Sequence, residues 1–168
     1  MMGSADPEVK AVPDTAPAAV VWLGYGGLLP FLATASGSWL DAAQAALWQQ
    51  ALLAYGAVIL AFVGALHWAF AMATDARAGR PTTAMYLWST VPALTGWAAL
   101  LLGLLPGRGR AFGMVLLMVA FLFHYQQDRR LAQLITLPEW YLPLRRRLTT
   151  VASICLLASA LSVAATVA

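Results

Sequence analysis

Residues 46–73 read ALWQQALLAYGAVILAFVGALHWAFAMA, a stretch with no Asp, Glu, Lys or Arg. A helix needs about 20 mostly apolar residues to cross the hydrocarbon of a bilayer, and this stretch is longer than that. Across the 168-residue chain, hydrophobic residues make up 61% and charged residues only 10%. A soluble domain of this size could not hide so much apolar surface from water. We therefore predict that the bilayer is its solvent, with backbone polar groups paired inside helices or a closed barrel.

Helices are favoured over a barrel. A transmembrane barrel needs alternating apolar and polar residues in segments of roughly ten. The chain instead has continuous apolar runs, such as residues 96–105 and 111–123. The sequence thus predicts an all-α fold, an integral membrane bundle of five transmembrane helices. The predicted spans cover residues 18–36, 46–73, 83–105, 112–125 and 148–167, the fourth extending toward Asp128.

The first 17 residues differ in composition from the rest. Residues 1–17 are rich in Pro and Ala and hold three acids but no Arg. They are predicted to form a disordered cytoplasmic tail, which leaves residues 18–168 as the transmembrane helical domain. The acids and the missing Arg do not suit a mitochondrial transit peptide. A cleaved signal peptide is an alternative for the first span, because residues 33–35 (ATA) resemble a cleavage site; the acidic start and long apolar run favour a retained span.

The basic residues predict the orientation. With five spans, residues 1–17 and the links 74–82 and 128–147 share one side, which holds eight Lys and Arg. The other side holds only Arg108 and Arg110. The positive-inside rule then places the N-terminus in the cytoplasm and the C-terminus outside. The inverted topology would carry eight basic residues across the membrane. The basic residues are scattered among short links, and membrane orientation accounts for them. The basic pI therefore does not indicate nucleic-acid binding, and no nucleic-acid partner is predicted.

Small residues and prolines predict how the helices pack. Within residues 46–73, small residues recur at every fourth position, and such residues let helices approach closely in lipid. They are Ala57, Ala61, Ala65, Ala69 and Ala73. We therefore predict that this helix is central. Pro92 and Pro30 are predicted to kink their spans, Pro30 near the outer end. Such kinks either line a substrate site, as in transporters, or only shape packing.

The two histidines of the chain are predicted to share a layer near the cytoplasmic face. His67 and His124 differ in predicted depth by only about 6 Å. Three interpretations stay open: hydrogen bonding to neighbouring helices; a polar cluster with Asp75 and Asp128 that binds a headgroup or small ligand; or a bis-histidine haem or metal site. Two lone histidines are a weak haem or metal signal, so no metal and no cofactor are predicted.

The link 128–147 is predicted to lie on the inner membrane surface. Residues 131–137 are mostly apolar, and Pro138-Glu139-Trp140-Tyr141 and Arg145-Arg146-Arg147 follow. Apolar residues would dip into the interface while the arginines contact anionic lipid headgroups. A simple topology anchor is the alternative.

No catalytic residues are predicted. The chain has no Gly-rich phosphate loop after a strand, no HExxH and no paired cysteines. Its single Cys155 lies inside an apolar run, as expected of a small hydrophobic side chain. These observations favour a role other than enzyme.

Four stretches together resemble one family. They are Gly27-Leu-Leu-Pro30-Phe31; Tyr55-x-x-x-Ile59-x-x-Phe62-x-Gly64-x-x-His67-Trp68; Pro92-Ala-Leu-x-x-Trp97; and Pro138-x-Trp140-Tyr141-x-x-Leu144-Arg145-x-x-Leu148-Thr149. The pattern is similar to that of small multispanning bacterial inner-membrane proteins of unknown function, related to mitochondrial transmembrane protein 69. The resemblance implies a small multi-pass protein of the bacterial inner (plasma) membrane. In that membrane, the orientation predicted from the basic residues makes the C-terminus periplasmic. His124 is not among the matched residues.

Three functions are therefore considered. The leading hypothesis is a non-enzymatic accessory or scaffold protein of the energy-transducing membrane, with a membrane-protein partner. The alternative is a small-molecule or lipid-binding protein or transporter with a site near the cytoplasmic face, and a minor alternative is a bis-histidine haem protein. Candidate binding residues are His67, Trp68, Asp75, Trp140, Tyr141 and Arg145. A polar, inward-facing site at His67 and Arg145 would favour binding, whereas the same side chains facing lipid would favour the scaffold.

Overall fold

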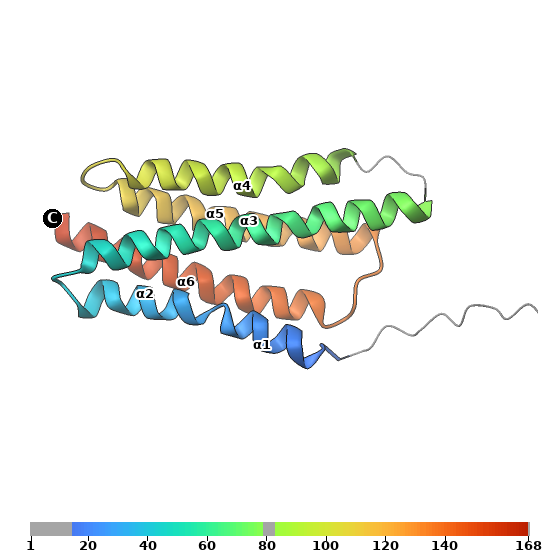
Figure 1. Ribbon diagram of the computed structural model, residues 1–168, viewed down its shortest axis with the longest axis horizontal. Coiled ribbons are helices and arrows are strands. Elements are labelled where there is room, and N and C mark those ends of the chain that lie inside the picture. Colours follow the sequence, from blue (N-terminus) through green and yellow to red (C-terminus); the bar gives the residue numbers. More distant parts are fainter. Residues whose placement is uncertain (1–14, 79–82, 168) are drawn as a thin grey trace, which may run out of the picture.

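The computed structural model describes residues 15–78 and 83–167, with side chains over residues 15–74 and 83–165. The described parts form helices that run up and down beside one another (Figure 1). They are α1 (Ala18–Gly26), α2 (Leu29–Leu40), α3 (Ala45–Ala78), α4 (Thr83–Gly103), α5 (Gly109–Leu134) and α6 (Tyr141–Val167). Because α1 and α2 together make one span, five helical segments are long and apolar enough to cross a membrane. The predicted all-α, five-span fold is confirmed. The predicted tail lies almost wholly outside the described residues.

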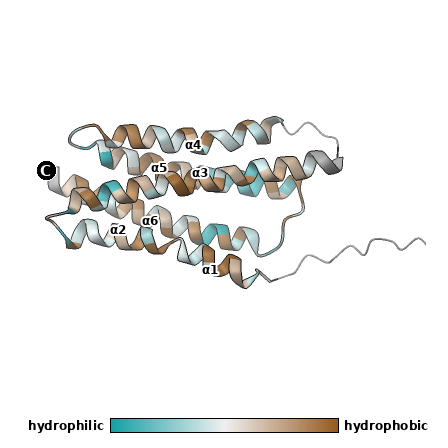
Figure 2. Cartoon of the chain, in the orientation of Figure 1, coloured by the Kyte–Doolittle hydropathy of each residue, from teal (hydrophilic) through white to brown (hydrophobic). Residues whose placement is uncertain are grey.

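The outer surface of the bundle is apolar. Trp22 is 79% exposed and Leu40 is 85% exposed. Figure 2 shows apolar residues along every helix, with hydrophilic residues mainly toward the two ends of the bundle. An apolar surface of this extent suits contact with hydrocarbon chains and not with water. The starts of α1, α4 and α6 and the ends of α3 and α5 lie together (Figure 1). We call this the inner end, because the positive-inside rule predicts that it faces the cytoplasm.

The first span is broken in its middle. α1 ends at Gly26, and Pro30 lies in the first turn of α2. Proline has no N–H for the helical ladder, and its ring collides with the carbonyl four residues earlier. The carbonyl of Gly27 accepts a hydrogen bond from the Tyr55 hydroxyl at 2.9 Å. The kink predicted near the outer end is instead an interruption of the helix near mid-span, where Gly27 and Leu28 keep right-handed helical dihedral angles. α1 has no buried residue, so this half of the span is only loosely packed.

α3 is the central helix, as its small residues predicted. It packs against α2, α4, α5 and α6. Gly64 lets α4 approach closely, because a Cβ at this position would lie 2.7 Å from the Pro92 ring. α4 continues through Pro92, so this proline shapes the packing of two helices. The core beneath consists of fully buried side chains, including Leu52, Leu53, Leu60, Met114, Leu117 and Leu156.

The link between the last two spans is much shorter than predicted. α5 continues to Leu134 and α6 begins at Tyr141, so only residues 135–140 connect them. The predicted surface segment over 128–147 was therefore wrong for most of its length. Asp128 and Arg145 were expected outside the spans, but they form an ion pair inside the bundle. Pairing removes much of the cost of burying each charge alone, so the helices can continue through both positions.

Candidate functional site

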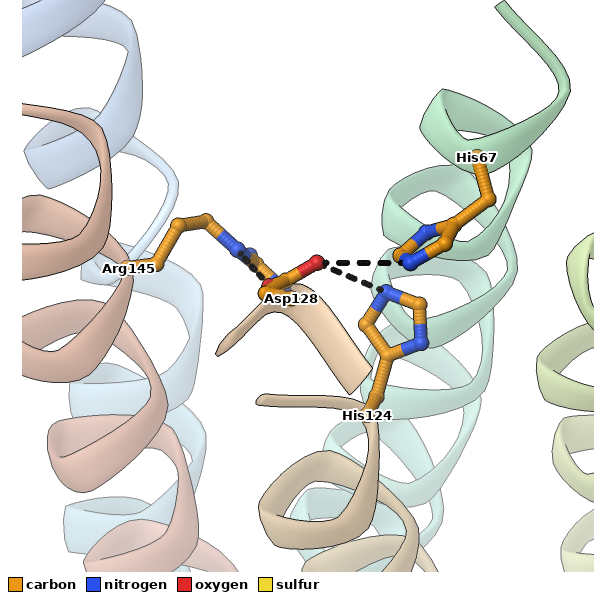
Figure 3. A network of polar contacts seen from close by, with 4 residues as sticks. All are labelled: His67, His124, Asp128 and Arg145. Atoms are coloured by element: carbon orange, nitrogen blue, oxygen red, sulfur yellow. Dashed lines mark hydrogen bonds and ion pairs between the residues drawn. The ribbon is translucent and has the colours of Figure 1, made fainter. Parts of the chain in front are cut away.

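Asp128 lies at the centre of a buried polar cluster near the inner end (Figure 3). Its Oδ2 accepts a hydrogen bond from Nε of Arg145 at 2.8 Å. Its Oδ1 lies 3.7 Å from Nε2 of His67 and 3.8 Å from Nε2 of His124. His67 comes from α3, His124 and Asp128 from α5, and Arg145 from α6. The cluster therefore joins three helices around one carboxylate.

The helical register brings these groups together. His124 and Asp128 are four residues apart on α5, and residues at that spacing share a helix face. The His67 and His124 rings lie with their centroids 4.7 Å apart, so the prediction that both histidines share one layer is confirmed. His67 precedes Thr74, where the apolar part of α3 ends, by seven residues or about 10 Å. The cluster thus lies inside the apolar region, close to its inner boundary.

The cluster is closed to solvent. The side chains of His67, His124 and Asp128 are exposed by only 4%, 1% and 1%. Arg145 is the cation that balances the Asp128 carboxylate, with 10% of its side chain exposed. Removing one member of such a pair leaves the other charge buried and unbalanced.

Several polar atoms of the cluster lack a well-formed hydrogen bond. They include both ring nitrogens of His67 and of His124 and Oδ1 of Asp128. The separations of 3.7 and 3.8 Å are too long for hydrogen bonds. Tyr141 is a close neighbour of Asp128 and Arg145, yet its hydroxyl makes no hydrogen bond of good geometry. Buried groups in this state call for an explanation, because unsatisfied polar atoms are rare in folded proteins.

Aromatic side chains wall the cluster on two sides. The Trp88 ring from α4 stacks on His124 with centroids 6.2 Å apart and an interplanar angle of 10°. Phe70 meets His67 edge-on at 6.5 Å and Tyr141 at 6.0 Å. These rings restrict the orientation of both imidazoles.

An apolar pocket adjoins the cluster. It has a volume of about 400 Å³ and lies between α1–α2 and the faces of α3, α5 and α6. Leu23, Phe31 and Leu66 are among its apolar lining residues, and Tyr141 and Arg145 also line it. The pocket therefore extends from the polar cluster to the side of the bundle where α1 packs loosely.

The structure brings together some of the predicted site residues and separates others. His67, Tyr141 and Arg145 meet at Asp128, and Trp140 lines the adjoining pocket. Trp68 is 48% exposed and packs against Tyr86, away from the pocket. The Asp75 side chain lies outside the described residues. Arg145 was expected at lipid headgroups, and this was wrong, because its guanidinium turns inward to Asp128.

Sequence reasoning underrated Asp128 and missed Trp88. Asp128 was named only as a possible member of a polar cluster and as the approximate end of a span. The His-x-x-x-Asp spacing of His124 and Asp128 was the available signal, because it places two ligand-type side chains on one helix face. No comparable signal marks Trp88, because His124, on which it stacks, comes from another helix.

The chemistry of the cluster suits a metal ion better than a haem. His67, His124 and Asp128 each offer one ligand atom, and these atoms all lie within 4.8 Å of one another. Axial haem ligands would face each other across a porphyrin. Here both Nε2 atoms instead point toward the same carboxylate oxygen (Figure 3), so the arrangement does not favour a bis-histidine haem.

The fold and cluster define a polytopic, all-helical integral membrane protein with ionisable groups buried among its spans. The chain belongs to the family described as Protein of unknown function (DUF3429), which matches residues 16–161. It is 35% identical over 157 residues to Transmembrane protein 69 of Xenopus tropicalis. The aligned region covers 90% of this chain and 57% of that relative, so the chain spans little more than half of the relative's length. No solved structure matches the chain. The predicted family relationship is confirmed, whereas the bacterial inner membrane stays a prediction.

Proposed function

We propose that the protein binds a membrane-soluble ligand of the lipid or quinone type in the pocket beside Arg145. The single observation that carries this proposal is the pocket itself. Its volume of about 400 Å³ falls within the range of roughly 300–1,000 Å³ that small-molecule sites occupy. Its lining is mostly apolar, with a few polar side chains at the inner end. This combination suits a molecule with an apolar body and one polar head.

The polar side chains specify the kind of head. Tyr141, Arg145 and Thr149 all line the pocket. The Tyr141 hydroxyl, Nη2 of Arg145 and the Thr149 hydroxyl are buried in the pocket wall and make no well-formed hydrogen bond, although the Tyr141 hydroxyl lies close to Asp128 and Arg145. All three can donate a hydrogen bond, so the complementary head carries an acceptor oxygen. Because Asp128 already neutralises Arg145, a neutral carbonyl or ester oxygen fits the local charge.

The loosely packed α1 supplies a route to the pocket. Val20, Leu23 and Gly24 of α1 line it, yet α1 itself has no buried residue. The first span is interrupted at Gly27 and Leu28, between α1 and α2. Broken helices beside membrane binding sites are a recurring feature of transporters. A ligand dissolved in the bilayer can therefore enter beneath α1 without disturbing the packed core.

The orientation of His67 and Arg145 supports binding over the scaffold role. Both side chains face inward and are buried, with exposures of 4% and 10%. A scaffold would place such side chains at lipid, headgroups or a partner surface. An accessory role in the energy-transducing membrane accordingly receives less support from this geometry.

Ligand retention after purification in mild detergent tests the proposal. Leu66 lines the pocket, so Leu66→Trp should fill part of it, whereas Leu94→Trp changes the groove between α3 and α4. Native mass spectrometry with lipid and quinone extraction should find one bound species in the wild type and in Leu94→Trp, but much less in Leu66→Trp. The extracted species distinguishes a phospholipid from a quinone. Equal retention by both variants, or recovery of only bulk lipid, would contradict the proposal.

A further inference from the structure

We propose that His67, His124 and Asp128 bind a single divalent transition-metal ion, of the zinc or ferrous class. This inference goes beyond the proposed ligand pocket and does not depend on it. The metal would lie among Nε2 of His67, Nε2 of His124 and Oδ1 of Asp128, three atoms contributed by α3 and α5.

The distances are close to those of a coordination sphere. A zinc–nitrogen bond of about 2.0–2.1 Å in a tetrahedral site places neighbouring ligand atoms about 3.3 Å apart. The two nitrogen–oxygen separations here are 3.7 and 3.8 Å. All ligand atoms lie within 4.8 Å of one another, so a modest contraction would complete the site. Direct hydrogen bonds would need a shorter approach than these separations.

The ligand atoms are also available. The Nε2 atoms of His67 and His124 and Oδ1 of Asp128 are buried and make no well-formed hydrogen bond. Their three side chains are each at least nine-tenths buried. Buried polar atoms that converge without satisfying one another indicate a missing common partner. An ion that accepts lone pairs from all three atoms is such a partner.

Neighbouring groups hold the ligands in place. Arg145 donates to Oδ2 of Asp128, which fixes the carboxylate and leaves Oδ1 turned toward the histidines. His124 also lies against the backbone of Val63 and is stacked by Trp88. Partners of this kind around metal ligands orient the rings and select the coordinating nitrogen.

The ligand set indicates the class of metal. Two imidazoles and one carboxylate suit zinc or ferrous iron, whereas calcium and magnesium prefer oxygen ligands throughout. Three protein ligands leave a fourth coordination position open. Because Arg145 already balances Asp128, a dication would bring uncompensated positive charge into a buried place. The fourth ligand should therefore be anionic, such as hydroxide or a carboxylate.

Metal binding can be measured on the full chain, purified through a tag that contains no histidine and treated with chelator. Titration of the wild type with Co²⁺ should show saturable binding of one equivalent, with the visible absorption of a four-coordinate site. Zn²⁺ should displace the Co²⁺ and abolish the colour. No saturable uptake by the wild type would overturn the proposal and favour a water molecule among the three groups.

Variants locate the ion. Loss of a residue that merely supports a metal ligand lowers metal affinity by about 10- to 100-fold. His67→Asn and His124→Gln each remove a ligand itself, so each should weaken Co²⁺ binding by more than that. Ser89→Ala is the matched control, because the Ser89 hydroxyl is buried and donates a hydrogen bond to the Tyr86 carbonyl of its own helix. Unchanged affinity in either histidine variant would refute the site.

One measurement avoids dependence on variant folding. The chain holds only two histidines, so any imidazole bound to a metal must be His67 or His124. Pulsed electron paramagnetic resonance of the Cu²⁺-loaded wild type should show nitrogen modulation from two imidazoles. A Cu²⁺ spectrum with no imidazole nitrogen would place the ion elsewhere and overturn the proposal.

Discussion

Nε of Arg145 and Oδ2 of Asp128 lie 2.8 Å apart, and this contact ties the start of α6 to the inner part of α5. Both residues are within helices that are long and apolar enough to cross a membrane. Truncating one partner of a buried ion pair typically costs about 3–5 kcal/mol, because the remaining charge stays buried and unbalanced. The pair is therefore expected to be sensitive to single changes and tolerant of a matched double change.

Arg145→Gln should destabilise the protein by about 3–5 kcal/mol, and Asp128→Asn by a similar amount. The double variant, which removes both charges, should recover a large part of that loss. Unfolding in detergent, followed by tryptophan fluorescence, measures the three free energies of unfolding. Strict additivity of the two single effects would show that the two side chains do not act as a pair.

Two glycines, Gly64 and Gly26, should respond in opposite ways to substitution by alanine. Gly64→Ala places a Cβ 2.7 Å from the Pro92 ring, and overpacking of this kind costs about 1–3 kcal/mol. Gly26→Ala meets nothing within 4 Å, so removing the glycine's backbone freedom should stabilise the protein by about 0.4–1 kcal/mol. Thermal unfolding of both variants tests the contrast. A Gly64→Ala protein as stable as Gly26→Ala would mean that α3 and α4 are not so closely packed.

The Tyr55–Gly27 hydrogen bond predicts that one hydroxyl stabilises the break in the first span. Tyr55→Phe leaves the Gly27 carbonyl without its donor, at a cost of about 1–3 kcal/mol. Tyr25→Phe is the control, because the Tyr25 hydroxyl is only weakly bonded, at 3.5 Å from exposed Arg147. Hydrogen exchange of the amides in residues 24–32, with global unfolding, separates local from global effects. Equal behaviour of the two variants would show that this hydroxyl does not support the break.

The spans could be predicted from the sequence because apolar length and missing charge are properties of contiguous residues. Residues 46–73 are the clearest case, since no charge interrupts them and their small residues match the central place of α3. The fourth and fifth spans were predicted too short because Asp128 and Arg145 look like loop residues until their pairing is known. A buried ion pair depends on residues 17 positions apart, and hydropathy along the chain does not report it.

The site was predictable in part for the same reason. His67, Tyr141 and Arg145 were candidates from residue type and resemblance, and they do meet. Trp68 matched the same pattern, yet it turns the other way on α3, because adjacent helical residues point in different directions. The central role of Asp128 and the pocket beneath α1 both arise from packing between helices. Their discovery required the three-dimensional arrangement.

The distribution of basic residues predicts which end of the bundle faces the cytoplasm. The inner end carries Arg129, Arg130, Arg146 and Arg147, whereas Arg108 and Arg110 lie at the other end. Arg145 forms the buried ion pair with Asp128, but the remaining exposed arginines still give an excess of positive charge at the inner end. A cytoplasm-only reporter fused after residue 168 should therefore be inactive, and a periplasm-only reporter should be active. An active cytoplasm-only reporter with an inactive periplasm-only reporter would show that the protein has the inverted orientation.

A matched pair of charge variants tests the cause of that orientation. Arg146→Gln with Arg147→Gln removes two exposed cations beside α6 without touching the Asp128–Arg145 contact. This change should raise the fraction of molecules whose C-terminus faces the cytoplasm, because fewer cations then oppose translocation of the inner end. Arg108→Gln with Arg110→Gln should leave the wild-type orientation intact or strengthen it. The contradicting outcome has two parts: the Arg146/Arg147 change leaves both reporter signals unaltered, and the Arg108/Arg110 change inverts them. That result would show that exposed arginines do not set the topology as we infer.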